Sequence, residues 1–218
     1  MQFSIIQRVM GLLLILFSFT MLPSLIAGLL NADHTLRAFA WSYGITLVSG
    51  LVLWLPVRHA VKELRLRDGF VIVSLFWVLL AFFGSLPFMF SGTTKIMADA
   101  YFETMSGLTT TGSTVLTGLD TLAPAINLWR GILQFLGGIG IVVLAVAILP
   151  LLGVGGMQLY KAETPGPMKD AKLTPRIKET AKALWLIYLG LIVLCMLCLW
   201  LAGMTPFDAM IHSFTALS

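Results

Sequence analysis

The sequence predicts an all-α polytopic membrane protein built from repeated membrane-pore-membrane units, each with a re-entrant pore helix and a filter loop. Three observations lead to this prediction. Hydrophobic residues make up 58% of the 218 residues and charged residues 11%, whereas about a quarter of the residues in a globular domain are charged. The chain contains five long apolar runs. Between two of them, a short helical segment ends in an uncharged loop of hydroxyl side chains around one glycine.

The five apolar runs have the length of about 20 residues that a membrane-spanning helix needs. They lie near residues 5–30, 39–57, 70–90, 127–152 and 183–203. Basic residues cluster in 58–68 and 153–182, while 31–38 and 91–126 are neutral or acidic. By the positive-inside rule, the basic loops and the N-terminus are cytoplasmic. The alternation holds only if segment 97–114 enters and leaves the membrane from the outer face.

The short helical segment is expected from near Met97 to Leu108, about 18 Å long at 1.5 Å per residue. Residues 109–114, Thr-Thr-Thr-Gly-Ser-Thr, follow it. Irregular backbone persists at membrane depth only where protein covers it or water lines it. The loop offers uncharged carbonyl and hydroxyl oxygens, which suit a dehydrated monovalent cation. The C-terminal end of the helix dipole also favours a cation here.

Charged residues near this loop allow more than one interpretation. Asp99 and Glu103 lie four residues apart on one helix face. They either cap and solvate an external helix or attract cations to the mouth of a pathway, and the sequence leaves both open. Arg130 lies at the start of the next span, where snorkelling to the outer interface is favoured over a role in the pathway.

The short segment recurs after a shift of 109 positions. Residues 99–109 align with 208–218: Asp-Ala recurs, and Glu-Thr-Met-Ser-Gly-Leu-Thr falls on His-Ser-Phe-Thr-Ala-Leu-Ser. This predicts a second pore helix from near Pro206, with Ser218 as the first residue of a second filter loop. One loop cannot surround an ion with about six to eight oxygens, so about four such loops are needed. We therefore expect the chain to be a fragment that stops within its second unit.

The cytoplasmic segment between the last two spans contains helix-breaking residues. Its prolines and glycine in 163–175 predict a boundary, and 175–182 is expected to form a basic helix that leads into the final span. The basic residues are confined to short loops instead of forming one patch, so nucleic-acid binding is excluded.

Three classes of function remain for comparison. The uncharged loop and its repeat favour a channel-like potassium transporter. A secondary transporter coupled to protons or sodium would place ionisable residues at mid-membrane, and the spans here are almost free of charge; it stays the alternative. A membrane enzyme would need clustered nucleophiles, carboxylates or metal ligands. Cys195 and Cys198 have no further ligand nearby and are assigned to packing, so no enzyme is predicted.

Three features resemble the Trk/Ktr/HKT superfamily of potassium transporters, and within it the bacterial potassium-uptake subunits: the sequences of 98–114 and 129–140, and the second pore helix. The resemblance covers the whole chain as the N-terminal half of such a protein. It implies two extra N-terminal transmembrane helices in 1–68, a first membrane-pore-membrane unit in 69–156, a cytoplasmic linker in 157–182, and the start of a second, truncated unit in 183–218.

The resemblance also implies potassium uptake across the bacterial inner (plasma) membrane by a multi-pass protein. Potassium would be the transported ion, with no organic cofactor. In the family each filter loop contributes one glycine, which corresponds to Gly112. Main-chain carbonyls of Thr110, Thr111 and Gly112 would hold the ion, and Ser218 would begin the second loop. A filter with so few glycine-permitted carbonyls should prefer potassium over sodium only modestly.

The partners implied by the resemblance are a second copy of the chain, giving a homodimer, and a cytosolic TrkA-type nucleotide-binding regulatory subunit. The basic loops 58–68 and 157–182 are the surfaces available to that subunit. Attraction to anionic membrane lipid explains the same charges equally well.

Overall fold

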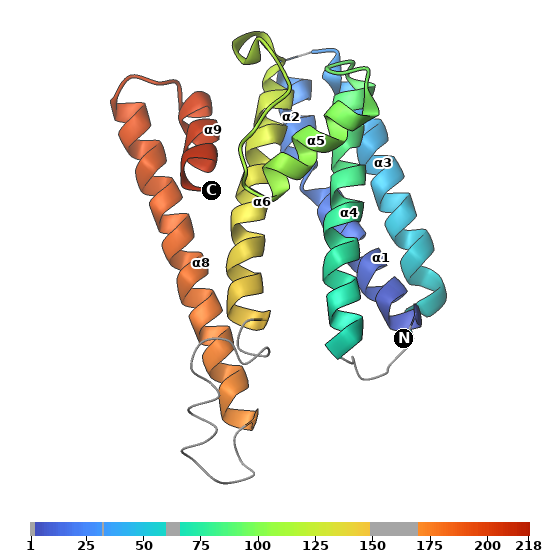
Figure 1. The fold of residues 1–218 in the computed structure, drawn as a ribbon. Helices are drawn as coiled ribbons and strands as arrows, with labels where there is room; N and C mark the ends of the chain where they lie inside the picture. The colour runs from blue at the N-terminus through green and yellow to red at the C-terminus, as the bar shows by residue number, and fades with distance from the viewer. Residues whose placement is uncertain (1–2, 32, 60–65, 149–169) are drawn as a thin grey trace. The chain divides into compact units, whose positions relative to one another are not determined.

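The computed structural model describes residues 3–31, 33–59, 66–148 and 170–218, and the regular structure in these ranges is entirely helical (Figure 1). The helices are α1 Phe3–Phe19, α2 Leu22–Leu30, α3 Thr35–Trp54, the 3-10 turn η1 Leu55–Val57, α4 Leu66–Phe90, α5 Met97–Leu108, the 3-10 turn η2 Leu119–Thr121, α6 Pro124–Ile148, α8 Asp170–Leu201 and α9 Pro206–Leu217. The predicted all-α polytopic fold is confirmed.

Within the described ranges, four helical stretches are long and apolar enough to cross a membrane. They are Phe3–Leu30, Thr35–Val57, Val71–Phe90 and Lys182–Leu201, and they correspond to four of the five expected spans. The fifth, expected over 127–152, corresponds to α6, and 149–152 lie outside the described residues. The first stretch is divided into α1 and α2, with Pro23 in the first turn of α2, because proline has no N–H group for the preceding turn.

Helix α8 begins earlier than expected. The boundary predicted up to Pro175 is wrong in its described part, since α8 starts at Asp170 and includes Pro175. A single proline removes one main-chain donor from a helix, and here the helix continues through it. Of the expected linker 157–182, residues 170–182 are therefore helical, and 157–169 lie outside the described residues.

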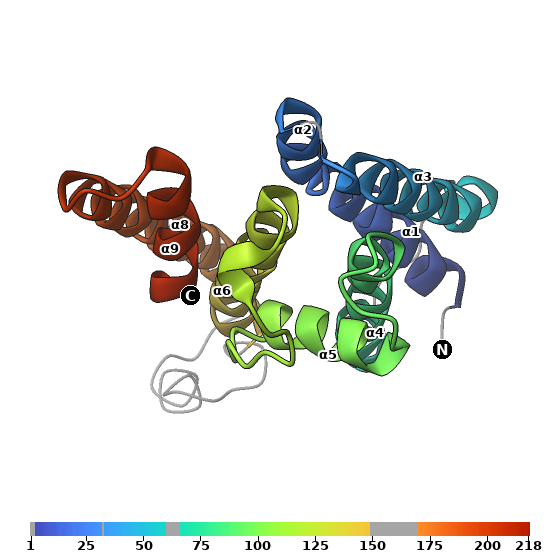
Figure 2. The ribbon, with the colours of Figure 1, turned by 90° about the horizontal axis from the view of Figure 1, so that it is seen from above.

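The chain divides into two compact units, Met1–Leu133 and Gln134–Ser218, and α6 crosses their boundary. In the first unit, α1 packs against both α3 and α4, as the view from above shows (Figure 2). The indole of Trp129 is fully buried there. Its ring centroid lies 5.8 Å from that of Phe17 and 6.2 Å from that of Phe39. Its Nε1 donates to the carbonyl oxygen of Gly84 at 3.0 Å, which ties α6 to α4.

Glycines allow close contact between α1 and α3. A Cβ at Gly11 would lie 2.7 Å from the backbone nitrogen of Trp54, and a Cβ at Gly50 would lie 2.9 Å from that of Ile15. Small residues of this kind let membrane helices approach through their backbones. The pair α1 and α3 therefore forms a tight support beside α4.

Helix α5 turns back into the first unit. Helix α5 packs against α4. The chain then returns through 109–123, and α6 begins near the C-terminal end of α4 (Figure 1). A Cβ at Gly84 would lie 2.6 Å from Cγ2 of Thr104, so a glycine on α4 makes room for α5. The helix predicted from Met97 to Leu108 is confirmed, as is the helix predicted from Pro206.

Candidate filter loop

The loop after α5 begins with a strained helix end. The N–H groups of Thr110 and Thr111 donate to the carbonyl oxygens of Gly107 (3.0 Å) and Ser106 (2.9 Å), the hydrogen-bond pattern of a Schellman motif. This motif needs left-handed backbone, and Thr110 has a φ of 55°. Helix α8 ends in the same pattern with Gly203 at the corresponding position. A threonine in this conformation costs on the order of 1–3 kcal/mol, which marks the position as a functional candidate.

Gly112 has left-handed backbone as well, with a φ of +72°. A Cβ built there would meet no atom within 4 Å, so the backbone conformation and not the available space requires glycine. Between described residues, no hydrogen bond ends on the carbonyl oxygens of Thr110, Thr111 or Gly112. Three consecutive main-chain oxygens therefore have no hydrogen-bond donor among the described residues.

Hydroxyl groups tie both ends of this segment to the last turn of α5. Oγ1 of Thr109 donates to the carbonyl oxygen of Met105 at 2.8 Å and lies 2.8 Å from Oγ1 of Thr111. Because the Thr109 hydrogen is already used, Thr111 is the donor in that pair. On the far side of Gly112, Oγ of Ser106 donates to the carbonyl oxygen of Ser113 at 2.6 Å.

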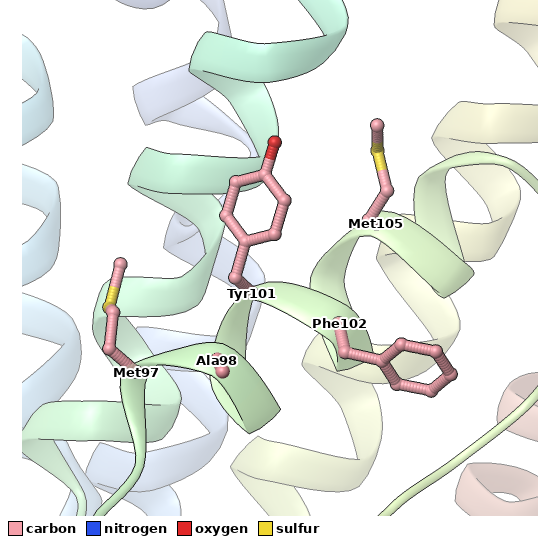
Figure 3. Close-up of a pocket in the computed structure, with 5 residues that line it drawn as sticks. All are labelled: Met97, Ala98, Tyr101, Phe102 and Met105. Atoms are coloured by element: carbon pink, nitrogen blue, oxygen red, sulfur yellow. The ribbon is translucent and has the colours of Figure 1, made fainter.

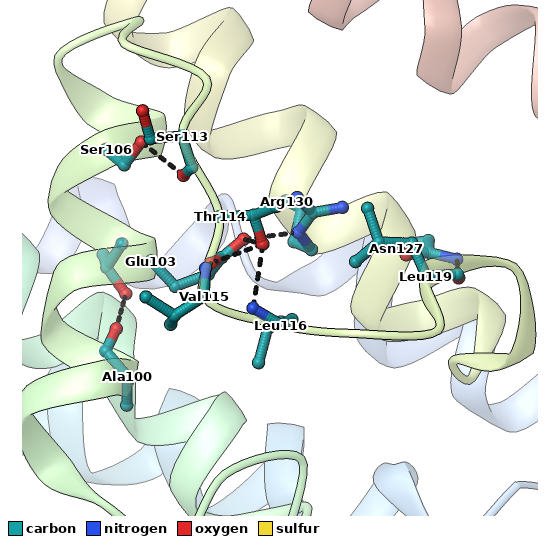
Figure 4. Close-up of polar contacts among 11 residues, drawn as sticks. Ala100, Glu103, Ser106, Ser113, Thr114, Val115, Leu116, Leu119, Asn127 and Arg130 are labelled. Carbon is teal, nitrogen blue, oxygen red and sulfur yellow. Dashed lines mark hydrogen bonds and ion pairs between the residues drawn. The ribbon is translucent and has the colours of Figure 1, made fainter.

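A buried carboxylate lies beside the outgoing part of the loop (Figure 4). Glu103 is 4% exposed. It accepts hydrogen bonds from Oγ1 of Thr114 at 3.0 and 2.9 Å and from the N–H group of Val115 at 3.2 Å. Nε of Arg130 on α6 donates to its Oε1 at 2.7 Å. Farther along, Nδ2 of Asn127 donates to the carbonyl oxygen of Leu119.

These contacts bear on two interpretations of the sequence. Glu103 does not solvate an external helix, because its side chain is buried and bonded to the loop; attraction of cations by Asp99 and Glu103 stays a prediction. Snorkelling of Arg130 to the outer interface also stays a prediction, and its guanidinium pairs with Glu103. Sequence reasoning missed this pair together with Thr114 and Val115. The pair could have been suspected from the sequence, because a carboxylate and a guanidinium occur on the two helices that flank one uncharged loop.

An apolar depression of about 570 Å³ lies on α5, lined by Met97, Ala98, Tyr101, Phe102 and Met105 (Figure 3). The helical spacing of these residues puts them on one face. None of the predicted site residues lines it, and its side chains offer almost no oxygen to a cation. The depression is therefore apolar, whereas the loop offers carbonyl and hydroxyl oxygens.

In the second unit, Ser218 follows α9 and has its own partners. Its Oγ donates to the carbonyl oxygen of Phe214 at 2.6 Å and lies 2.7 Å from Oη of Tyr188. The ring of Phe135 stacks on those of Tyr188 (5.9 Å between centroids) and Phe214 (4.9 Å). A Cβ at Gly138 would lie 2.4 Å from Oη of Tyr188, so glycine is needed for this contact.

The described residues contain no group of three or more His, Cys, Asp or Glu side chains that could hold a metal ion. Cys195 and Cys198 are free thiols. A monovalent cation would instead use main-chain and hydroxyl oxygens. The structure brings Thr110, Thr111 and Gly112 together in one loop, whereas Ser218 belongs to the other unit.

Comparisons with known proteins identify the family of the chain. The family model described as TrkH, cation transport protein, matches residues 35–218. The chain is 57% identical along its full length to the Trk system potassium uptake protein TrkH of Halomonas elongata and 56% identical to that of Escherichia coli strain K12, and it spans 45% of the length of each. The crystal structure of the potassium transporter TrkH from Vibrio parahaemolyticus matches 98% of the chain and 42% of its own, with a TM-score of 0.83 and 50% identity. The chain belongs to the TrkH family of cation transport proteins.

Proposed function

We propose that this chain contributes to potassium uptake across a membrane, and that the main-chain carbonyl oxygens of Thr110, Thr111 and Gly112 take the place of water around the ion. The observation that carries the proposal is the set of three consecutive carbonyl oxygens without a hydrogen-bond donor among the described residues. They lie in an uncharged loop, which disfavours multivalent ions. The relatives in Halomonas and Escherichia carry the name potassium uptake protein, which supports potassium as the ion.

The geometry of α5 supports a cation at this loop. The C-terminal end of a helix carries a partial negative charge, and α5 ends directly at Thr109. Its last-turn oxygens already accept the N–H groups of Thr110 and Thr111, so the loop is held without using the three free carbonyls. An ion can therefore bind without breaking the helix end.

One loop supplies too few oxygens for a complete site. A dehydrated potassium ion takes about six to eight oxygens, so about four loops must converge on it. We propose that Ser218 begins a second such loop and that further loops complete the filter in the full protein. With a single left-handed glycine in this loop, a short filter with modest preference for potassium over sodium is expected.

The remaining parts of the proposal concern location and assembly. The chain is a multi-pass protein of the bacterial inner membrane with a cytoplasmic N-terminus, and α5 re-enters from the outer face. It acts as a homodimer with a TrkA-type nucleotide-binding subunit on its basic cytoplasmic side, where anionic lipid is the competing partner. Potassium is cargo, no organic cofactor takes part, and no chemical conversion is involved.

Two glycine substitutions test the proposed filter. Gly112→Ser in the full protein should lower the potassium/sodium uptake preference by about tenfold, or about 1.4 kcal/mol, in cells that lack other potassium-uptake systems. Gly92→Ser is the matched control, because Gly92 has a φ of +76° and also meets nothing within 4 Å of a built Cβ, but follows α4. Unchanged discrimination in Gly112→Ser would refute the filter.

Uptake into membrane vesicles distinguishes a channel-like transporter from a secondary transporter coupled to protons or sodium. Uptake of rubidium into vesicles driven only by a rubidium gradient and membrane potential is expected to persist when proton and sodium gradients are abolished. Uptake that stops with either gradient would favour a secondary transporter.

A further inference from the structure

We infer that Glu103 and Arg130 are a positioning pair that sets the geometry of the filter loop and thereby controls how well the protein distinguishes potassium from sodium. This inference rests on the proposed function of the loop. Neither side chain is expected to touch the ion. They would act through Thr114 and Val115, which lie just past the proposed ion-binding residues.

The carboxylate of Glu103 hydrogen-bonds to the loop. Glu103 is buried, and its two oxygens accept from the Thr114 hydroxyl and the Val115 N–H group. Oγ1 of Thr114 accepts in turn from the N–H group of Leu116 at 3.1 Å. Two consecutive residues of the outgoing chain, Thr114 and Val115, thus bond to a single side chain of α5, and Leu116 bonds to it indirectly through Thr114.

Arg130 pairs with this carboxylate and holds it in place. A buried carboxylate needs a charged partner or several donors, and Nε of Arg130 approaches Oε1 at 2.7 Å. Arg130 comes from α6, whose Trp129 is bonded to α4. The pair therefore links the loop to helices on both sides of it (Figure 4).

Residues 110–112 lie between two sets of hydrogen bonds to α5. On the incoming side, Thr111 donates its N–H group to Ser106. On the outgoing side, Ser113 accepts from the same Ser106, and Thr114 donates to Glu103. Residues 110–112 form a short bridge between these fixed points. Releasing the outgoing anchor lets the carbonyl oxygens change their spacing, which weakens discrimination between ions of different size.

Glu103→Gln is the first test, in the full protein. An amide keeps one acceptor oxygen but replaces the other by a donor, so it cannot accept from both Thr114 and Val115 while pairing with Arg130. We expect the potassium/sodium preference to fall by about tenfold. Asp99→Asn, the same charge change on the same helix, is the matched control and should leave the preference unchanged.

Thr114→Val is the second test, and it leaves the ion pair intact. It removes the hydroxyl donor, so the preference should fall as it does in Glu103→Gln, and combining the two changes should add little because both break one contact. This variant keeps the inference falsifiable if Glu103→Gln does not reach the membrane.

The variant Glu103→Gln with Arg130→Gln separates positioning from folding. Neutralising both partners removes the uncompensated buried charge, so the amount of folded protein should recover relative to Arg130→Gln alone, while the preference stays low. Recovery of the preference in this double variant, or a preference within about twofold of the unmodified protein in Glu103→Gln and Thr114→Val, would overturn the inference. Absence of potassium or rubidium uptake by the unmodified protein would instead overturn the proposed function, and this inference with it.

Discussion

Helices α5 and α9 have the same length and begin 109 positions apart, yet different chemistry holds the residues that follow them. Each ends with a hydroxyl that donates to the carbonyl four residues earlier, from Thr109 to Met105 and from Ser218 to Phe214. Within the helices the two differ. The residue at position 103 is a buried glutamate paired with arginine, and the residue aligned with it, His212, is exposed.

In the described part of the second unit, neutral contacts hold Ser218. Tyr188, Phe135 and Phe214 stack, and the Tyr188 hydroxyl contacts Ser218. The N-termini differ too: Thr205 caps α9 by accepting from the N–H group of Asp208, whereas Ile96 before α5 has no side-chain cap. A repeated helix therefore specifies where a loop begins, but the neighbouring helices decide how it is held.

Gly84→Ala should have the largest effect on the first unit. Its Cβ would lie 2.6 Å from Cγ2 of Thr104 and 3.2 Å from Cζ of Phe17, and overpacking costs about 1–3 kcal/mol. The melting temperature of the purified protein should fall. Gly44→Ala on α3, where a Cβ meets nothing within 4 Å, should instead stabilise the protein by about 0.5–1 kcal/mol. Equal effects would contradict the close contact between α4 and α5.

Gly138→Ala tests the neutral contacts of the second unit. The new Cβ would lie 2.4 Å from Oη of Tyr188, so the ring must move and give up its contact with Ser218, at a cost of about 1–2 kcal/mol. Tyr188→Phe removes Oη and should recover part of the loss in thermal stability. If the two substitutions are simply additive, the Tyr188 hydroxyl is not what Gly138 accommodates.

Thr110→Gly tests whether the left-handed backbone of Thr110 is strained. Glycine adopts a φ of 55° freely, so the free energy of unfolding should rise by about 1 kcal/mol. The potassium/sodium preference should fall at the same time, because the loop gains freedom. Thr111→Gly is the control: Thr111 is not among the described residues with positive φ, so glycine should destabilise it by about 0.5–1 kcal/mol. A loss of stability in Thr110→Gly would show that the backbone there is unstrained.

The helix caps should give the smallest effects. Thr205→Ala removes the cap of α9 and should cost about 1 kcal/mol. Ile96→Ser offers α5 the cap it lacks and should gain up to about 1 kcal/mol. Hydrogen exchange of the first turn of each helix reports both changes, and protection that moves in the same direction in the two variants would show that the helix starts do not differ as described.

Local features of the chain were predictable from the sequence. The bounds of α5 and α9 follow from apolar patterning and from the 109-residue repeat. The role of Gly112 in a filter, which the family resemblance implies, stays a prediction. The division of the first span before Pro23 and the continuation of α8 through Pro175 were missed. Proline disfavours a continuous helix, but whether the helix ends there depends also on the neighbouring residues.

The anchors of the loop could not be predicted because they join residues that are distant in the sequence. Glu103 and Arg130 are 27 positions apart, and Tyr188 and Ser218 are 30 apart. Charge and spacing alone left Glu103 with two roles, and its burial excludes the solvation of an external helix. The left-handed backbone of Thr110 was also missed, since propensity favours glycine there.

Rubidium bound to the full protein can be located by its anomalous scattering, which distinguishes it from water, and its position shows whether the loop binds the ion. We expect rubidium in contact with the carbonyl oxygens of Thr110, Thr111 and Gly112, with the bonds from Thr114 and Val115 to Glu103 intact. Rubidium bound elsewhere, with these three carbonyl oxygens hydrogen-bonded to protein donors, would contradict this expectation.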